Sequence, residues 1–183
     1  MAKKKIGVLV GSLRRDSYSK KIAEHVAGLL AGEFEVEFVD IGGLEMYNQD
    51  FDLDNKVPES WQALRDQIFA LDGFLFVTPE YNRSVPAVLK NALDVASRDV
   101  RKPFDGKPGA VVSVSPGALS AFGANHHLRQ SAVFLNILMM QQPEAYIGNV
   151  VSVLDENGKV VNEGTDGFLK LIADSFIAWV NKF

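Results

Sequence analysis

The first indication of the fold is the stretch Lys5-Ile6-Gly7-Val8-Leu9-Val10-Gly11-Ser12, an apolar run that ends at a glycine and a serine. Residues 6–10 are apolar without alternation, which is typical of a strand buried on both faces of a sheet. Residues 11–19 follow with serines and arginines, and they lead into a helical pattern. A buried strand, a polar loop and a helix in this order favour an α/β protein.

The same alternation continues to the end of the chain. Residues 34–39 alternate with period two, as expected of an edge strand, and residues 73–78 and 109–114 are two further buried strands. Apolar residues at helical spacing occupy residues 22–30, 58–71, 85–96, 127–136 and 168–180, and an apolar segment at 137–140 precedes the last helix. Right-handed crossovers then predict a doubly wound parallel sheet with helices on both faces.

Two connecting segments complete this arrangement. Residues 41–57 have no clear period and are predicted to form a long loop, and the acidic cluster at residues 50–54 is interpreted as a solvated loop, with a cation site as the alternative. Asn157-Gly158 favours a tight hairpin between the fifth strand and the last helix.

The composition describes a globular chain without cysteine chemistry. Of its 183 residues, 47% are apolar and 23% charged, which excludes wholesale disorder and suits one domain over residues 1–183. The net charge of −4 disfavours binding to nucleic acid. The absence of cysteine excludes disulfides, thiolate nucleophiles, iron–sulfur clusters and cysteine-ligated zinc. We find no signal-peptide or membrane-spanning pattern, and we therefore expect a cytoplasmic protein without a membrane partner.

The three histidines do not form a metal-binding pattern. His126 and His127 are adjacent in a helical pattern and point in different directions, so they cannot chelate one ion together. We expect surface or subunit-contact roles for both, and a surface position for His25.

The first loop, residues 11–19, is a candidate anion site. Ligands of an open parallel sheet bind outside the carboxyl ends of the strands, where this loop lies. Hydroxyl groups, an arginine and the free N–H groups of a helix N-terminus together suit a single phosphate monoester. The loop has neither the P-loop spacing nor the three glycines of the dinucleotide fingerprint. The alternative is that Ser17 or Ser19 merely caps the helix and Arg14 is a solvated side chain.

The second and third loops supply candidate walls for a flat ligand. Ser84 and Pro86 suit a helix cap and first turn, which leaves Pro79-Glu80-Tyr81-Asn82 unexplained. A rigid kink, an aromatic face, an amide and backbone N–H groups suit a heteroaromatic ring, although an ordinary turn with a packed tyrosine would have the same composition. Residues 115–123 are small and apolar, so that backbone can approach a ligand closely.

The motifs in these loops resemble those of a known family. Gly11-Ser12-Leu13-Arg14-x-x-Ser17-x-Ser19 and Pro79-Glu80-Tyr81-Asn82-x-Ser84-x-Pro86-x-x-Leu89-Lys90-Asn91-Ala92-x-Asp94 are similar to the NAD(P)H-dependent FMN reductases, and within them to bacterial chromate and quinone reductases. The stretch His127-Leu128-Arg129-Gln130 and the pair Pro143-Glu144 are also similar to that subgroup. The resemblance covers essentially the whole chain.

The resemblance implies a flavodoxin-like three-layer α/β/α sandwich with a five-stranded parallel sheet in the order 2-1-3-4-5. It implies one non-covalent FMN in each subunit of a homodimer or homotetramer. One departure from the family is Pro116, which removes a backbone donor beside the ring. The residues expected to bind the cofactor are Ser12, Arg14, Ser17 and Ser19 at the phosphate, and Pro79, Glu80, Tyr81, Asn82, Ser84, Ser115 and Gly117 around the isoalloxazine.

The activity implied by the resemblance is hydride transfer from NAD(P)H to flavin N5, followed by reduction of quinones or of other acceptors such as chromate, azo compounds and free flavin. This order is ping-pong and requires no catalytic side chain, since the flavin carries the redox chemistry. A flavodoxin-like electron carrier without substrate turnover is the main alternative. An acyl hydrolase with Ser12 as nucleophile is disfavoured. Such enzymes carry an aspartate between this glycine and this serine and an Asp-x-x-His motif late in the chain, whereas here Gly11 directly precedes Ser12 and no histidine follows His127.

Overall fold

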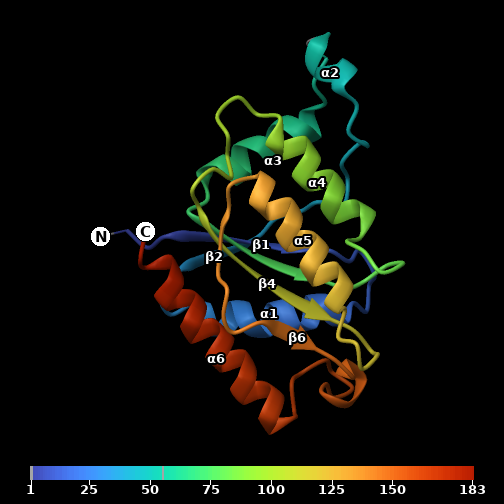
Figure 1. Cartoon of the computed structure of the whole chain (residues 1–183), viewed down its shortest axis with the longest axis vertical. Helices are drawn as coiled ribbons and strands as arrows, with labels where there is room; N and C mark the ends of the chain where they lie inside the picture. The colour runs from blue at the N-terminus through green and yellow to red at the C-terminus, as the bar shows by residue number, and fades with distance from the viewer. Residues whose placement is uncertain (1, 55) are drawn as a thin grey trace.

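The computed structural model describes residues 2–54 and 56–183, in which strands and helices alternate along the chain (Figure 1). In chain order the elements are β1 (Lys5–Val10), α1 (Tyr18–Leu30), β2 (Glu35–Phe38), α2 (Gln49–Leu53), α3 (Glu59–Ala70), β3 (Gly73–Thr78), α4 (Ala87–Ser97), β4 (Pro108–Val114), α5 (Phe122–Phe134), β5 (Leu138–Met139), β6 (Ala145–Ile147), the short 3-10 helix η1 (Val150–Ser152) and α6 (Glu163–Val180).

The strands form one sheet in the order β2-β1-β3-β4-β5, and its pairings are parallel. This order confirms the predicted flavodoxin-like topology. The chain first moves outward from β1 to β2 and then crosses to β3 on the other side, so the switch point lies between β1 and β3. Ligands of such sheets bind at the carboxyl ends of the strands beside the switch point.

The edge strand beside β4 is interrupted, which corrects the prediction of five continuous strands. β5 pairs with the first two residues of β4, Pro108 and Gly109, whereas β6 pairs with residues 112–114 at the end of β4. The segment between β5 and β6 contains Pro143, which has no N–H group to donate to a ladder. The apolar segment 137–140 therefore supplies only part of this edge, and β6 is a sixth, minor strand.

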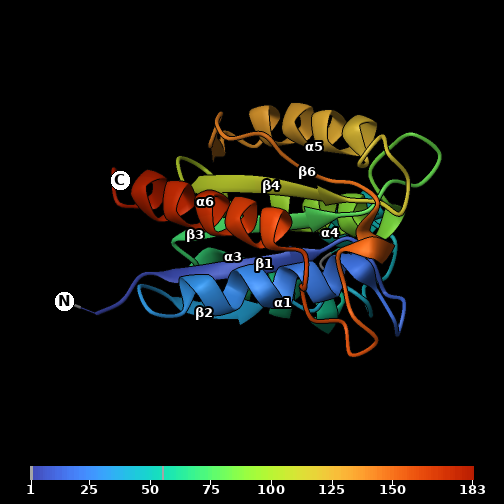
Figure 2. The same ribbon diagram turned by 90° about the horizontal axis from the view of Figure 1, so that it is seen from below.

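Helices cover both faces of the sheet, and the strand residues alternate between the two faces. Leu75 and Val77 of β3 belong to the core formed with α1 and α6, whereas Phe74 and Phe76 belong to the core formed with α3, α4 and α5. Figures 1 and 2 show α1 and α6 side by side along one face, with α3, α4 and α5 on the other. This is the predicted three-layer sandwich.

The segment predicted as a loop at residues 41–57 contains the short helix α2, which projects from the body of the molecule (Figure 1). Asn48 is its N-cap, and its side chain accepts a hydrogen bond from the N–H of Asp50 (3.1 Å). The acidic cluster is not simply solvated, because Asp52 accepts two hydrogen bonds from Arg65 (2.8 and 3.0 Å). The Asn157-Gly158 hairpin is confirmed by the antiparallel bridge between Leu154 and Val160.

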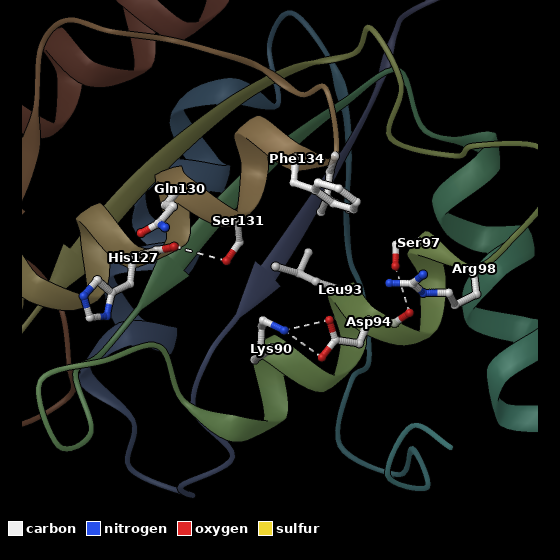
Figure 3. A pocket seen from close by; sticks show the side chains of 10 residues that line it. Lys90, Leu93, Asp94, Ser97, Arg98, His127, Gln130, Ser131 and Phe134 are labelled. Atoms are coloured by element: carbon white, nitrogen blue, oxygen red, sulfur yellow. Dashed lines mark hydrogen bonds and ion pairs between the residues drawn. The ribbon is translucent and has the colours of Figure 1, made fainter. Parts of the chain in front are cut away.

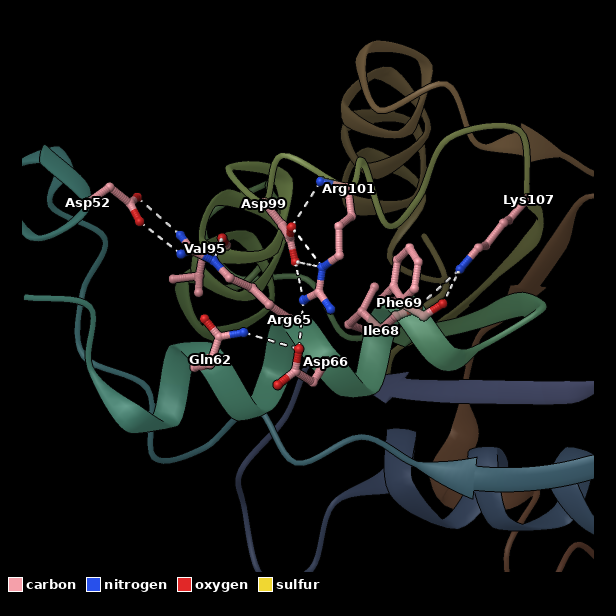
Figure 4. A network of polar contacts seen from close by, with 10 residues as sticks. All are labelled: Asp52, Gln62, Arg65, Asp66, Ile68, Phe69, Val95, Asp99, Arg101 and Lys107. Atoms are coloured by element: carbon pink, nitrogen blue, oxygen red, sulfur yellow. Dashed lines mark hydrogen bonds and ion pairs between the residues drawn. The ribbon is translucent and has the colours of Figure 1, made fainter. Parts of the chain in front are cut away.

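A network of charged side chains holds α3 against α4 and the loop after it (Figure 4). The Arg65 side chain is 6% exposed, and its Nε donates to the carbonyl of Val95 (3.0 Å). Arg101 donates to both Asp99 and Asp66. The hydrogen bonds from Arg101 hold the pKa of Asp99 below its usual value, so this carboxylate stays charged at neutral pH. These contacts join α3 to α4 and to the loop that follows α4.

No helix within residues 2–54 and 56–183 is both long enough and apolar enough to cross a membrane.

Candidate ligand site at the carboxyl ends of the strands

Three loops meet beyond the carboxyl ends of β1, β3 and β4. The first two cross at Gly11, whose N–H donates to the carbonyl of Val77 (2.9 Å). A Cβ atom at Gly11 would lie 3.1 Å from the Thr78 hydroxyl and 3.2 Å from Cδ of Pro79, so glycine permits this close approach. Between the loops is a hollow of about 210 Å³. The hollow is lined by Ser12, Arg14, Ser17, Tyr18, Ser19, Pro79, Glu80, Tyr81, Val114, Ser115 and Pro116.

The end of the hollow beside α1 is polar and positively charged. Ser17 is the N-cap of α1, and its hydroxyl accepts a hydrogen bond from the N–H of Lys20 (3.1 Å). Ser17 therefore caps the helix, as one of the two interpretations predicted, and it also lines the hollow, so a ligand-binding role is compatible with capping. An α-helix leaves its first N–H groups without intrahelical acceptors, and this end attracts anions.

Arg14 supplies the charge at this end. Its side chain is exposed, and the guanidinium carbon lies 5.8 Å from the centre of the Tyr18 ring. The ion pairs that arginines form within the described residues involve Arg65, Arg83 and Arg101, and Arg14 takes part in none of them. Its charge is therefore available to a bound anion.

The second loop forms a tight hairpin. Tyr81 and Ser84 exchange both backbone hydrogen bonds, at 3.1 and 3.0 Å. Asn82 and Arg83 between them have positive φ angles of 51° and 66°, as the turn of a two-residue hairpin requires. Tyr81 is 46% exposed and presents an aromatic side chain to both the hollow and the solvent.

The expectation that Ser84 caps α4 is wrong. This helix begins at Ala87 with Pro86 at the N-cap, and no side chain caps it. The backbone of Ser84 is held in the hairpin instead, and its hydroxyl lies 3.0 Å from Nδ1 of His127 on α5.

The third loop offers side-chain surface rather than amide donors. The N–H of Ser115 donates to the carbonyl of Ile147 (2.9 Å), and the Ser115 hydroxyl accepts the N–H of Gly117 (3.0 Å). Pro116 between them has no N–H group. Val114 and Pro116 therefore form an apolar part of the wall.

The structure brings most of the predicted site residues together. Asn82, Ser84 and Gly117 belong to the same loops but do not line the hollow. Tyr18 and Val114 line the hollow but are not among the predicted site residues. The position of Tyr18 between two predicted serines is a signal from which it could be identified in the sequence. The predicted residues that line the hollow are Ser12, Arg14, Ser17, Ser19, Pro79, Glu80, Tyr81 and Ser115.

The histidines have separate partners, as their positions in the sequence predict. Nε2 of His126 lies 2.9 Å from the hydroxyl of Tyr146, whereas His127 contacts the hairpin. Burial raises the pKa of Tyr146, so this phenol stays protonated at neutral pH. His25 is half-buried on α1, with Nε2 3.0 Å from Asp166 of α6.

The fold and the hollow together define a class of protein: a flavodoxin-like α/β protein with its ligand site beside the switch point of a parallel sheet. The family model for NADPH-dependent FMN reductases matches residues 4–152 of the chain. The chain belongs to this family of oxidoreductases, whose cofactors are FMN and a reduced nicotinamide nucleotide.

Similar proteins agree with this assignment. A quinone reductase of Pseudomonas putida is 49% identical over 176 residues, which are 96% of this chain and 94% of the relative. A 2-hydroxy-1,4-benzoquinone reductase of a Burkholderia species is 49% identical over 177 residues, 96% of each chain. The structure of FerB, a flavoenzyme NAD(P)H:acceptor oxidoreductase of Paracoccus denitrificans, superposes with a TM-score of 0.90 at 39% identity and covers 98% of both chains. These findings decide for an enzyme and against the electron carrier and the hydrolase.

Replacement of Ser17 by alanine should lower the free energy of unfolding by about 1 kcal/mol, because α1 loses its N-cap. Ser19→Ala is the matched control, since Ser19 is equally buried in the same turn but does not cap the helix. Urea unfolding without added ligand, followed by circular dichroism, measures both variants. An equal loss in both would show that burial of a hydroxyl, rather than capping, is responsible.

Proposed function

We propose that the hollow holds one FMN without a covalent bond, and that the enzyme uses NAD(P)H to reduce quinones. Chromate, azo compounds and free flavin are proposed as further acceptors. The observation that carries the proposal is that one hollow unites a cationic helix N-terminus with a wall of proline and tyrosine. The names of the relatives from Pseudomonas and Burkholderia support quinones as the acceptor class.

The residues at the α1 end fit the phosphate monoester of FMN. Arg14 would form charge-assisted hydrogen bonds with the phosphate oxygens, because it has a guanidinium free of ion pairs among the described residues. Ser12 and Ser19 also line the hollow and would offer hydroxyl groups to the phosphate, and Ser17 orders the helix N-terminus whose N–H groups would face the anion.

The residues at the other end fit a flat ring. Pro79, Tyr81 and Pro116 present rigid or planar surfaces and would exclude water from one side of the isoalloxazine. Bound FMN supplies the redox chemistry, accepting hydride from the nicotinamide and passing electrons to the acceptor. No histidine lines the hollow in the described chain, and we assign no acid or base to the reaction.

The size of the hollow supports a single open face. Its volume of about 210 Å³ is below the roughly 300–1,000 Å³ typical of ligand pockets, so part of FMN would lie outside it. The predicted contacts of Asn82, Ser84 and Gly117 would be made with that outer part. NAD(P)H and the acceptor would then use the same open side in turn.

We also propose that the chain forms a homodimer or homotetramer. A groove of about 500 Å³ runs between α4 and α5 (Figure 3), with Lys90, Asp94 and Arg98 along α4. Phe134 on the α5 side is 82% exposed, and its neighbour Val133 is 75% exposed. Exposed apolar side chains beside a charged groove suit a contact with a second copy.

The chain is further proposed to be one FMN-binding domain over its 183 residues, because the two cores share a single sheet. We propose the cytoplasm as its location, since its electron donor NAD(P)H is present there.

Arg14→Ala should weaken FMN binding by about 1.5–3 kcal/mol, the usual contribution of a hydrogen bond to a charged group, which is roughly a 10- to 150-fold rise in Kd. Titration of the apoprotein with FMN, followed by flavin fluorescence, measures the change. Arg15→Ala is the matched control, since Arg15 is an exposed neighbour that does not line the hollow. Equal affinity of the Arg14 variant and the parent would show that Arg14 is only a surface charge.

Initial rates measured against a quinone at several fixed NADPH concentrations should give parallel double-reciprocal lines. Parallel lines arise because NADP⁺ must leave the open side before the quinone enters. High quinone concentrations should also inhibit, since the quinone competes with NADPH for the same place. Intersecting lines, or a trapped ternary complex, would contradict the single-face mechanism.

Phe134→Ser should shift the mass measured by light scattering toward that of a single chain, because the apolar contact beside the groove is weakened. Leu171→Ser on α6 is the control, since this leucine is also half-exposed (52%) but lies on the opposite face of the sheet. A parent protein that is a monomer at micromolar concentration would contradict the proposed assembly.

A further inference from the structure

Helix α5 begins without a cap of its own. Its N-cap residue is Ala121, which has a positive φ of 58° and no side-chain oxygen. Alanine is among the poorest N-cap residues, since it leaves the first N–H groups of the helix without acceptors. The N–H of Phe122 donates to the nearby carbonyl of Leu119 (3.0 Å), whereas the N–H of Ala124 takes its acceptor from a distant part of the chain.

Glu80, 44 residues earlier, supplies that acceptor. Its Oε2 accepts the N–H of Ala124, the third residue of α5, at 2.9 Å, and its side chain is 13% exposed. A carboxylate at this place also interacts favourably with the helix dipole. A Cβ atom at Gly123 would lie 2.9 Å from both Oε2 of Glu80 and the carbonyl oxygen of Arg83, so glycine allows the hairpin to reach the helix.

A second contact joins the same two segments one turn further along α5. The hydroxyl of Ser84, at the other end of the hairpin, lies 3.0 Å from Nδ1 of His127. Figure 3 shows His127 at the end of the groove beside the loop that leads into α4. The hairpin is thus held against α5 at both of its ends.

The hairpin needs such support. It has a single pair of bridging hydrogen bonds, and an isolated two-stranded hairpin is at best marginally stable in water. Its turn also holds Arg83 at a positive φ of 66°, a conformation that is unfavourable for a residue with a Cβ atom. Tyr81 therefore has a defined place in the wall of the hollow only while the hairpin is anchored.

We propose that Glu80 is a positioning residue that holds the Tyr81 hairpin and the N-terminus of α5 in register, with Ser84 and His127 as a second anchor. Glu80 lines the hollow, but both of its carboxylate oxygens have partners within the protein: Oε2 accepts the N–H of Ala124, and Oε1 lies 3.6 Å from the guanidinium of Arg83. We therefore assign this carboxylate to the protein and not to the cofactor. This inference rests on the proposed FMN site, because Glu80 joins the hairpin of the second loop to the helix that follows the third loop, and both loops line that site.

The test compares Glu80→Ala and Glu80→Gln in the full chain, with two readouts. Amide hydrogen exchange of Ala124 in the FMN-free protein reports the contact itself, and titration with FMN reports the site. Glu80→Ala should accelerate the exchange of Ala124 and raise the Kd for FMN on the order of tenfold. Glu80→Gln keeps a carbonyl acceptor and should restore most of both.

The control is Glu163→Ala, which removes a carboxylate from the first turn of α6, a helix with its own cap at Asn162. It should change neither readout. His127→Ala removes the second anchor at an exposed residue and should give a smaller rise in Kd, which keeps the test valid if Glu80→Ala does not fold.

Three results would overturn the inference. Unchanged exchange of Ala124 in Glu80→Ala would show that the contact is not made, and faster exchange with unchanged FMN affinity would show that it does not position the site. Loss of FMN in Glu80→Gln with Ala124 still protected would make the carboxylate a direct ligand. Failure of the parent protein to bind FMN would instead overturn the proposed function, and this inference with it.

Discussion

The burial of β3 and β4 on both faces is the constraint on which the rest of the structure depends. Every residue of these two strands is buried, so helices have to cover both sides of the sheet. Parallel strands joined by helical crossovers meet this requirement. Because each crossover returns the chain to the same edge, the carboxyl ends of β1, β3 and β4 face one side together. The hollow lies where the loops after these strands meet, and its location is a consequence of how the core is buried.

The elements that were predicted well are those whose signals are local. Residues 73–78 are predicted as a strand and form β3 with the same bounds, because an apolar run that begins at a glycine and ends before a proline can be identified from the local sequence alone. Helix α5 begins at Phe122, five residues before the start of the predicted helix. Its N-cap residue has no side-chain acceptor, and the acceptor comes instead from Glu80, which local cap rules cannot identify. Likewise, the partner of Ser84 is His127 on another helix, and local cap rules contain no information about it.

The site was predictable to the level of its loops but not to the level of each side chain. Topology alone determines which loops meet, and the types of residue in them indicate an anion at one end and a flat ring at the other. Only the three-dimensional structure shows which hydroxyl groups already form hydrogen bonds within the protein. Ser17 accepts the N–H of Lys20 and Ser115 accepts that of Gly117, so both stabilise the chain while they line the hollow. The same few groups therefore stabilise the fold and line the candidate ligand site.

This double role of the lining groups affects which electron acceptors the enzyme could discriminate. The polar groups with partners inside the protein order the walls, namely Ser12, Ser17, Ser115 and Glu80, whereas Arg14 has a charge that the proposed cofactor could use. The hollow of about 210 Å³ is smaller than the roughly 300–1,000 Å³ of typical ligand pockets, so part of the proposed flavin would lie outside it. On the open side, a planar acceptor would meet mainly the cofactor itself. Planarity and redox potential, more than hydrogen bonding to this chain, would then determine which acceptors are reduced, which is consistent with a range of quinones.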